Sequence, residues 1–466
     1  MSNSAAAPLE VDLLVSGCDI VTIDAHDTVI RDGAIAVDAG RIVWVGKAGD
    51  APARYRGRTR LDGSGRIALP GLIDAHFHTA QQLLRGKIAE MGRTRQLKLP
   101  VWKNYLIPFE SGLDPEDVRL SATLGYVNML RVGTTCFAEA GGPHPDQMGE
   151  AALEVGIRGF VALSTIDQSE TIGAAVPHSM MMTAEEAYER NVALVKRWKG
   201  QGRVQAWLAL RQIIVCSPGL IKSIAAAARE LDIKIHTHLC EGTYEIDYAA
   251  EKFGRRPTEY LEELGVLSHR LHCAHSVLLS PEEVDLYAKH RLSACHCSFN
   301  NYAIGLPRLI EMWRRGIDIG LGTDGAATWG TLDIFQVAHI ARVAQQAVGG
   351  TPWHIRAPLT SEQLLRIATM GGARALGLAD QIGSLEVGKR ADFLLCDATE
   401  VDQMPVHDAL FVAANIVVGR DVRTVVVDGK VVMKEREILT VDVEEMRAKL
   451  VQRRPIIMER FEKAVV

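Results

Sequence analysis

Apolar and polar residues alternate with a period of two near both ends of the chain. Residues 1–66 contain DLLVSGCDIVTI and GAIAVDAGRIVWVG, and residues 381–466 contain SLEVGKRADFLLCD and VRTVVVDGKVVM. This alternation is typical of half-buried strands, and hairpin turns are expected at the Ala-Gly pair 39–40 and the Asp-Gly pair 428–429. The pattern predicts a small β-sandwich that both chain termini build, completed by a terminal helix.

Between these ends, residues 67–380 alternate short apolar runs with amphipathic helical stretches. The runs lie at 71–74, 134–138, 159–163, 204–210, 234–238, 271–275, 292–296 and 317–324. Helix start signals separate them, at Asp114-Pro115 and at the capping-box pairs Thr183/Glu186 and Ser280/Glu283. Strands interleaved with helices in this way predict an α/β fold, a TIM-like (β/α)8 barrel of parallel strands.

Composition and charge exclude several classes of protein. Hydrophobic residues make up 47% and charged residues 23%, as in ordinary globular proteins. The formal net charge is -5 without a basic stripe, so we expect no nucleic-acid partner. No apolar run approaches the ~20 residues of a membrane span, and the N-terminus lacks a signal-peptide pattern. The 8 cysteines have no framework spacing, which favours reduced thiols in a cytoplasmic protein.

The sharpest local signal is PGLIDAHFHTA, in which His76 and His78 end a predicted strand. Residues two apart on a strand point to the same side, so both imidazoles can reach one ion. His-x-His alone is common by chance, and two solvated loop histidines are the alternative. The metal-site interpretation gains weight because His238, His275 and Asp324 also end predicted strands, at the face where barrel active sites are built. Imidazoles with one carboxylate suit zinc or a similar ion.

Several motifs together resemble the amidohydrolase superfamily. They are PGLIDAHFHTA, MLRVGTTCFAEA, HLCEG, AHSVLLS, HCSFNN, GLGTDGAA and GARALGLADQIGSLEVGKRADFLL. The resemblance covers nearly the whole chain. It is specific for the branch that holds adenosine-type, S-adenosylhomocysteine and guanine deaminases together with triazine hydrolases, but it is not specific for one substrate.

The resemblance implies a role for each matching residue. Four positions match metal ligands, namely His76, His78, His238 and Asp324. Glu241, three residues after His238, matches the proton shuttle of the branch. His275 matches a histidine that orients the water or the substrate and sometimes touches the metal. His296 lies where the family often has a histidine near the substrate.

The chemistry of these side chains supports the same hypothesis. A metal ion lowers the pKa of its bound water and so supplies hydroxide near neutral pH. Asp324, beside that water, can accept its proton, and Glu241 can protonate a ring nitrogen as the attacked carbon becomes tetrahedral. His275 can steady the developing charge. An amine then leaves as ammonia.

Two departures from the resemblance concern the fourth predicted strand. Binuclear members carry a modified lysine at its end, whereas this chain reads WLALRQIIVCSP, which favours one metal over two. Arg211 occupies the position where nucleoside-type relatives usually have a histidine. It is expected either to clamp an anionic or carbonyl-bearing part of the substrate or to pair with an internal carboxylate.

For other residues near the motifs, the expected role follows only from their position in the sequence. Trp102, in the segment after the paired histidines, is a candidate for stacking on a flat ring, and packing in an apolar lid is the alternative. His236 alternates with His238 and is therefore expected to face the helix layer in a structural role, and His272 likewise.

We therefore expect a mononuclear metal-dependent hydrolase that deaminates an amino-substituted nitrogen heterocycle of purine, pterin, pyrimidine or triazine type. The cofactor is one divalent ion, Zn²⁺ first, with Fe²⁺ or Mn²⁺ as alternatives. The partner is a small heterocyclic substrate, with no membrane or nucleic acid, and a homo-oligomer is expected. A chlorohydrolase or alkylamine hydrolase of triazine-like rings is the alternative enzyme. An inactive barrel scaffold is the alternative outside enzymes, disfavoured because all the expected site residues are present.

Overall fold

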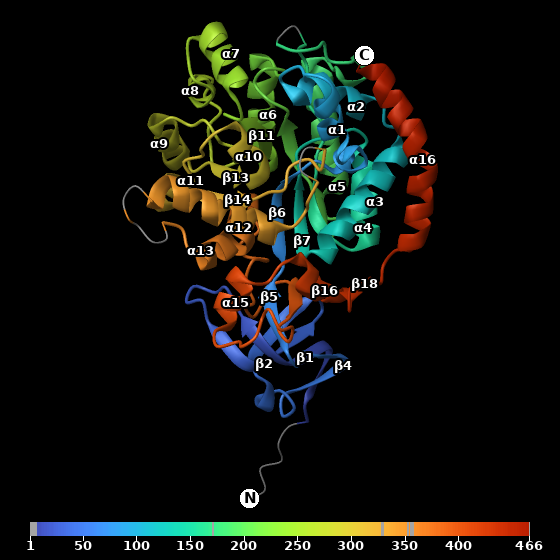
Figure 1. The fold of residues 1–466 in the computed structure, drawn as a ribbon, viewed down its shortest axis with the longest axis vertical. Helices are drawn as coiled ribbons and strands as arrows, with labels where there is room; N and C mark the ends of the chain where they lie inside the picture. Colours follow the sequence, from blue (N-terminus) through green and yellow to red (C-terminus); the bar gives the residue numbers. More distant parts are fainter. Residues whose placement is uncertain (1–6, 170–171, 328–329, 352–353, 355–357, 466) are drawn as a thin grey trace, which may run out of the picture.

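The computed structural model describes residues 7–169, 172–327, 330–351, 354 and 358–465. Within these residues, parallel strands surrounded by helices form one part of the molecule, and a separate sheet lies beneath it in the view of Figure 1. Strands from the two termini, blue and red in Figure 1, meet in that lower sheet.

Each of the apolar runs of the middle region forms a strand. They are β6 (Leu72–Phe77), β7 (Thr134–Glu139), β8 (Arg158–Val161), β9 (Val204–Ala206), β10 (Leu208–Leu210), β11 (Ile235–Leu239), β12 (Leu271–His275), β13 (Ser293–His296) and β14 (Asp318–Leu321). β9 and β10 are the two halves of one predicted strand, which is interrupted at Trp207. Among the described residues β9 belongs to the four-stranded sheet β6–β9 and β10 to the five-stranded sheet β10–β14, so this strand connects the two sheets. A parallel bridge between Phe77 and Asp324 joins the last strand to the first, and the predicted TIM-type barrel is thereby closed.

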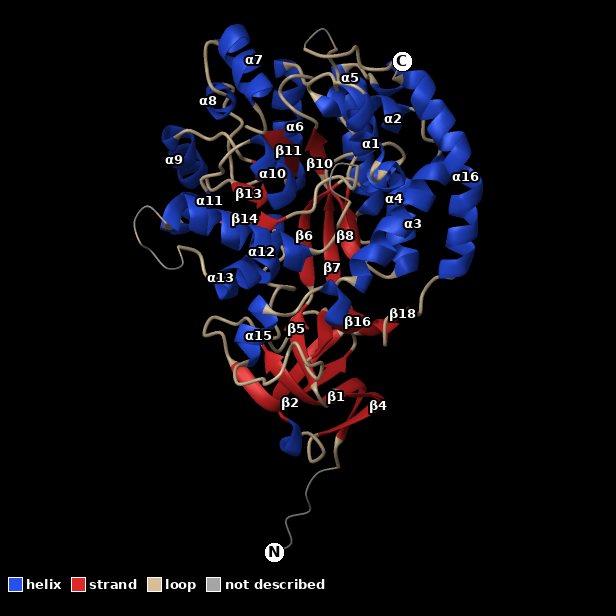
Figure 2. Ribbon diagram, viewed as in Figure 1, coloured by secondary structure: helices blue, strands red, loops and turns tan. Residues whose placement is uncertain are grey.

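Helices follow the strands and cover the outside of the barrel (Figure 2). They include α3 (Pro115–Arg131), α4 (Pro145–Val155), α5 (Ala184–Trp198), α6 (Pro218–Leu231), α7 (Thr243–Phe253), α8 (Pro257–Glu263), α9 (Pro281–His290), α10 (Ser298–Ile304), α11 (Leu309–Arg314), α12 (Ile334–Gln345), α13 (Ser361–Arg366) and α14 (Gly372–Leu376). The predicted start signals are confirmed. Asp114 and Ser280 form capping boxes, and the Thr183 hydroxyl accepts a hydrogen bond from the Glu186 N–H.

A segment between β6 and α3 lies over the barrel mouth. It contains the 3-10 turn η2 (Thr79–Leu84), α1 (Lys87–Thr94), the short π-helix η3 (Trp102–Leu106) and α2 (Ile107–Ser111). We call residues 87–111 the cap segment. Two of its side chains, Trp102 and Leu106, reach the cavity at the barrel mouth.

The terminal strands form one sheet of nine strands within the described residues. They are β1 (Leu9–Val21), β2 (Val29–Asp38), β3 (Arg41–Lys47), β4 (Tyr55–Asp62), β5 (Arg66–Pro70), β15 (Phe393–Asp397), β16 (Val422–Val427), β17 (Lys430–Lys434) and β18 (Glu437–Ile438). Ile35 of β2 and Phe393 of β15, two strands that are not neighbours in the sheet, belong to one buried core, so the sheet curves around it as the layers of the predicted sandwich would. Both predicted hairpin turns are confirmed, between β2 and β3 and between β16 and β17.

The terminal sheet lies against the ends where the barrel strands begin. β5 ends at Pro70 and β6 starts at Leu72, so a single residue separates the sheet from the barrel. Arg158 of β8 makes a buried two-pronged ion pair with Asp392, at 2.6 and 3.0 Å, which ties the two parts together. The carboxyl ends of the barrel strands therefore face away from the sheet. The domain limits predicted at 66/67 and 380/381 stay predictions.

The C-terminal helix α16 (Val443–Ala464) runs along the outside of the barrel (red in Figure 1). Arg453 holds it there, because the guanidinium donates hydrogen bonds to Asp117 at 2.7 and 2.9 Å and to Asp114 at 2.6 Å. A short helix, α15 (Ala409–Asn415), lies between β15 and β16 in the sequence. Among the described residues no helix combines the length and the apolarity needed to cross a lipid bilayer.

Candidate metal centre

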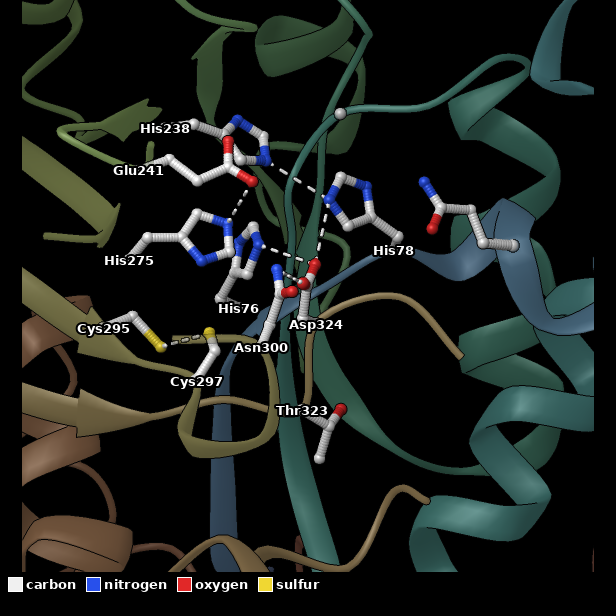
Figure 3. A network of polar contacts seen from close by, with 12 residues as sticks. His76, His78, His238, Glu241, His275, Cys295, Cys297, Asn300, Thr323 and Asp324 are labelled. Atoms are coloured by element: carbon white, nitrogen blue, oxygen red, sulfur yellow. Dashed lines mark hydrogen bonds and ion pairs between the residues drawn. The ribbon is translucent and has the colours of Figure 1, made fainter. Parts of the chain in front are cut away.

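Five side chains converge at the carboxyl ends of the barrel strands (Figure 3). Oδ1 of Asp324 lies 3.3 Å from His76 Nε2 and 3.5 Å from His78 Nε2. His238 Nε2 lies 3.2 Å from His78 Nε2. His275 completes the group, because one of its ring nitrogens lies within 4.8 Å of those of His76 and His238. All five predicted residues therefore surround one point.

The backbone explains why residues so far apart in sequence meet there. His76 lies in β6 and His78 follows it, two residues on, so both imidazoles face the same side. The Asp324 N–H donates to the His76 carbonyl at 3.0 Å, which places the carboxylate beside the paired histidines. His275 (φ 69) and Asp324 (φ 61) both adopt the left-handed backbone region. This conformation costs a non-glycine residue free energy, and residues that adopt it cluster at functional sites.

Hydrogen bonds behind the ring of metal-facing atoms orient these side chains. His238 Nδ1 donates to the Arg211 carbonyl at 2.7 Å, so Nε2 of the neutral ring presents its lone pair to the centre. Asp324 Oδ2 accepts a hydrogen bond from Asn300 at 2.7 Å, which leaves Oδ1 facing the histidines. His275 Nδ1 lies 3.1 Å from Asn301 Oδ1, so this nitrogen donates and Nε2 faces the cavity.

Burial and neighbouring charges set the protonation of the cluster. Burial lowers the pKa of His76 to about 4 and lowers the pKa values of His78 and His238 well below the usual range. Burial alone would raise the pKa of Asp324, but its contact with His76 and the charge of His275 hold it below the usual value. The centre thus offers three neutral imidazoles and one carboxylate. This donor set suits a divalent transition metal.

The distances also fit an ion. Ligand atoms bound tetrahedrally to one zinc ion at about 2.0–2.2 Å lie about 3.3–3.6 Å from one another. The separations of 3.3, 3.5 and 3.2 Å lie within or about 0.1 Å from that range. His76 Nε2 is buried and has no partner with hydrogen-bond geometry among the described residues, which leaves its lone pair for a cation. The side chains of His76, His78, His238 and Asp324 can therefore hold a metal.

Glu241 lies beside this centre on the same cavity. Its Oε1 is 3.9 Å from His275 Nε2, and its Oε2 accepts a hydrogen bond from Gln212 Nε2 at 3.2 Å. Although burial of His275 works in the opposite direction, the charges of Glu241 and Asp324 raise the pKa of this histidine to about 10. Glu245 holds both Glu241 and Gln212 in place. Its carboxylate accepts hydrogen bonds from the Glu241 N–H at 2.9 Å and from the Gln212 side chain at 3.3 Å.

A cavity of about 60 Å³ opens at the centre. It is lined by His78, Gln81, Trp102, Leu106, Arg211, Gln212, His238, Glu241, His275, Asn300, Asp324 and Gly325. A larger groove of about 1040 Å³ lies elsewhere, between the start of α7 and the region around α11, and none of the metal-facing residues lines it. The smaller cavity is therefore the one that can present a substrate to the metal.

Two of the three predicted substrate residues, Arg211 and Trp102, line this cavity, and His296 does not. The Arg211 guanidinium lies 3.0 Å from the Glu110 carboxylate, and both side chains are buried, with 3% and 1% of their surface exposed. Of the two interpretations of Arg211, the internal pair is thus present in the structure. His296 is buried beside Asn301, with Nδ1 3.1 Å from the amide nitrogen. Their substrate roles stay predictions.

The expectation for His236 is wrong. The residue does not face the helix layer, because His236 and His238 are two apart on β11 and so point to the same side. Its Nε2 lies 2.9 Å from His76 Nδ1, inside the barrel beneath the metal-facing atoms. His272, in register with His236 on the neighbouring strand, also points inward and lies 2.9 Å from the Ala75 carbonyl. Both are structural supports of the centre.

Sequence reasoning missed several residues of the site. Gln81, Gln212 and Asn300 line the cavity, and Asn300 binds Asp324 directly. Asn300 lies in the HCSFNN motif, which singled out this segment, whereas the two glutamines carried no signal of their own. The 8 cysteines are all buried and free, as the absence of a framework spacing predicts.

Comparisons with known proteins agree with the fold and with the site. A 5-methylthioadenosine/S-adenosylhomocysteine deaminase of Moorella thermoacetica is 33% identical over 448 residues, 95% of this chain and 98% of the relative. A zinc-bound adenosine deaminase of Xanthomonas campestris has a TM-score of 0.89 at 30% identity, covering 97% of this chain and 100% of its own. An atrazine chlorohydrolase of Arthrobacter aurescens TC1, in complex with zinc, has a TM-score of 0.82 at 26% identity, covering 95% and 100%. Because the model of the amidohydrolase family matches residues 67–432, this chain belongs to that family.

Proposed function

We propose that this protein is a mononuclear metal-dependent hydrolase that removes an amino group, as ammonia, from a nitrogen heterocycle. The observation that carries the proposal is the convergence of His76, His78, His238 and Asp324 beside Glu241 and His275 in one cavity. The deaminase named among the relatives, matched along nearly the whole chain, supports the same chemistry.

One divalent ion, held by His76, His78, His238 and Asp324, is the proposed cofactor. When bound, such an ion acts as a Lewis acid and lowers the pKa of a water molecule toward neutrality. Zinc is the first choice, because zinc is bound in two of the structural neighbours and the donors are imidazoles with one carboxylate. Fe²⁺ and Mn²⁺ are the alternatives. The end of β10 offers Arg211 and not a lysine, which supports one ion and not two.

Three side chains move or hold protons in the proposed reaction. Asp324 accepts the proton of the attacking water, because Asn300 occupies its Oδ2 and directs Oδ1 to the centre. Glu241 carries a proton to a ring nitrogen of the substrate, since its carboxylate lines the cavity and is held by Gln212. His275 steadies the negative charge on the oxygen that becomes bound to the attacked carbon, with Nε2 facing Glu241.

The substrate is proposed to be a flat amino-substituted ring. Trp102 lines the cavity and offers an aromatic face, so we assign it stacking on that ring. Arg211 is assigned a place in the wall of the pocket, where its charge is matched by that of Glu110. His296 is assigned an indirect role in substrate binding, behind Asn301, whose side chain also contacts His275.

A panel of ring substrates tests this function. The purified protein is incubated with amino-purines, amino-pterins, amino-pyrimidines, amino-triazines and chloro-triazines, and ammonia and chloride are both measured. Ammonia release from an amino ring supports deamination. Chloride release without ammonia would support the alternative, displacement of chloride from a triazine ring, which the likeness to the atrazine chlorohydrolase favours. Protein without stoichiometric zinc, iron or manganese would support an inactive scaffold.

We further propose that the protein works in the cytoplasm as a homo-oligomer. The 8 cysteines are buried and free, which suits a reducing compartment. Size-exclusion chromatography with light scattering tests the oligomeric state, and a monomer at micromolar concentration would contradict it.

A further inference from the structure

His236 lies directly behind one of the proposed metal ligands, inside the barrel. Its Nε2 is 2.9 Å from Nδ1 of His76. The other ring nitrogen of His76, Nε2, faces Oδ1 of Asp324 at 3.3 Å (Figure 3). Both histidine side chains are completely buried. The two nitrogens of the His76 ring therefore point in different directions, one to the metal-facing atoms and one to His236.

The rings of His76 and His236 meet through their edges. Their planes differ by only 4° and their centroids lie 5.0 Å apart. The nitrogen–nitrogen contact of 2.9 Å is shorter than the ~3.5 Å at which the faces of stacked rings touch, so it is not a stacking contact. It has the length of a hydrogen bond. One of the two nitrogens therefore carries a proton, and the other accepts it with its lone pair.

A metal ion at the centre determines which nitrogen carries that proton. Nε2 of His76 then offers its lone pair to the ion, so the single N–H of the neutral ring is on Nδ1 and donates to Nε2 of His236. His236 is thus also neutral, with its own proton on Nδ1. Metal-binding histidines usually donate their second N–H to a carboxylate, a carbonyl or water. Here the acceptor is another neutral imidazole.

His236 is a poor choice for the stability of the fold alone. Its Nδ1 is buried and has no hydrogen-bond partner among the described residues. A buried donor without an acceptor destabilises the folded state. Trp207 packs beside the ring, with 5.4 Å between the ring centroids, so an apolar side chain would fit the same surroundings without that cost. The contact with His76 is what distinguishes His236 from an apolar residue.

The contact with His236 is needed only when the ion is bound. In the metal-free protein the proton of His76 can move to Nε2 and face Oδ1 of Asp324 at 3.3 Å. With an ion on Nε2 the proton stays on Nδ1, inside the barrel, where an unpaired donor is costly. Nε2 of His236 is the acceptor within reach. Loss of His236 should therefore weaken the metal-bound state far more than the metal-free fold.

We propose that His236 is a positioning residue that fixes the proton and the ring orientation of His76, and that it thereby raises the affinity of the centre for its ion. The inference rests on the proposed function only through the metal centre, and it does not depend on which bond is hydrolysed. A neutral acceptor draws the His76 proton less strongly than a carboxylate would, so His76 stays a weaker base and the ion keeps more of its Lewis acidity.

The metal affinity of two His236 variants tests the proposal. Zn²⁺ is titrated into the metal-free protein in competition with a coloured chelator of known affinity. We expect His236→Leu, which has no acceptor, to raise the Kd for Zn²⁺ by about 10- to 100-fold. In His236→Gln the amide oxygen can accept from His76, so the Kd should stay within about threefold of the wild-type value.

Thr237→Val is the matched control for these titrations. Thr237 lies on the same strand, and its side chain points to the opposite face. The control should keep the wild-type Kd. An unchanged Kd in His236→Leu, or equal losses in His236→Leu and His236→Gln, would overturn the proposal.

Urea unfolding of the metal-free proteins separates positioning from a general structural role. We expect His236→Leu to unfold at a urea concentration no lower than that of the wild-type protein, because the variant removes a buried donor that has no partner among the described residues. A loss of metal-free stability that parallels the loss of affinity would overturn the proposal, since the variant would then damage the barrel itself.

NMR of the Zn²⁺-loaded protein shows the position of the protons directly. Long-range proton–nitrogen spectra of protein with isotope-labelled histidine distinguish rings protonated on Nδ1 from rings protonated on Nε2. The signals of His236 are assigned from their loss in His236→Gln. We expect both His76 and His236 to carry the proton on Nδ1, and a proton on Nε2 of His236 would overturn the proposal.

Failure of this inference and failure of the proposed function give different results. A Zn²⁺-loaded protein with the expected affinities and protonation that releases no ammonia would refute only the proposed function. Ammonia release by a protein in which His236→Leu binds Zn²⁺ as tightly as the wild type would refute only the role of His236. A protein that binds no divalent ion would overturn both.

Discussion

Asp324 and His76 meet twice, once through the backbone and once through the side chains. The Asp324 N–H donates to the His76 carbonyl at 3.0 Å, and Oδ1 of Asp324 lies 3.3 Å from His76 Nε2. The first contact belongs to the closure of the barrel, where the last strand returns to the first. Closure of the fold and assembly of the metal ligands are therefore the same event.

Asp324→Asn should disable the centre without unfolding the barrel. The amide keeps the shape of the side chain but removes the negative charge that faces His76 and His78. We expect metal content to fall, and kcat to fall by on the order of a thousandfold, because several kcal/mol of charge stabilisation are lost. Elemental analysis and ammonia release measure the two effects. Asp318→Asn, at the exposed start of β14, is the control, and an equal loss there would argue against a specific role.

Removal of the metal should abolish activity reversibly. Dialysis against a strong chelator is expected to remove about one ion per chain, and one equivalent of Zn²⁺, Fe²⁺ or Mn²⁺ should restore turnover. The ion binds only the folded state, so at a thousandfold excess over its Kd it adds about 4 kcal/mol to the free energy of unfolding. Calorimetry with and without metal measures this shift. A requirement for two ions per chain would contradict the mononuclear proposal.

Glu241→Gln should separate binding from catalysis. Glutamine keeps a similar size and its oxygen can still face Gln212, but it cannot carry a proton to the ring. We expect kcat to fall by about 10²- to 10⁴-fold, while metal content and affinity for the reaction product remain near wild-type values. Single-turnover kinetics and isothermal titration calorimetry measure these quantities. A variant with wild-type kcat would remove Glu241 from the mechanism.

The stability of the protein should depend on Arg211 and Glu110 being present together, because both side chains are buried. Arg211→Met leaves the Glu110 carboxylate buried without its partner, so we expect a loss of about 3–5 kcal/mol in the free energy of unfolding. Combining Arg211→Met with Glu110→Gln should recover most of that loss. Urea unfolding of the two single variants and the double variant measures the coupling. If Arg211→Met keeps its stability and weakens only the binding of anionic ligands, the residue is a substrate clamp instead.

Lys234 should make stability depend on pH above neutrality. Burial lowers the pKa of this lysine to about 8 in the folded protein, below the value of about 10.4 in an unfolded chain. Between these values the unfolded state binds more protons, so the free energy of unfolding rises with pH from about 8 to about 10.4. We expect Lys234→Met to lose this rise, of about 2 kcal/mol, which denaturant unfolding at pH 7.5, 9 and 10 measures. If the free energy of unfolding changes with pH in the same way in the wild-type protein and in Lys234→Met, the lowered pKa of Lys234 is contradicted.

Much of the fold follows from local patterns. The apolar runs at 71–74 and 317–324 became β6 and β14, although β14 ends three residues before Asp324, at Leu321. The strand signal could not locate that end, because the GLGTDG sequence remains apolar and small up to the aspartate. The prediction that His236 faces the helix layer was wrong for a reason that the sequence itself contains. The period of two that joins His76 to His78 applies equally to His236 and His238.

The sequence by itself determined the strands, the helix starts, and the identity of the side chains that surround the centre. These properties depend on periodicity and on the end of each strand, which neighbouring residues encode. Only the tertiary structure decided that Arg211 pairs with Glu110, and that Trp102 donates a hydrogen bond to Tyr244. Such partners come from separate segments of the chain that barrel closure brings together. No local period records which donor will meet which acceptor across the mouth of a barrel.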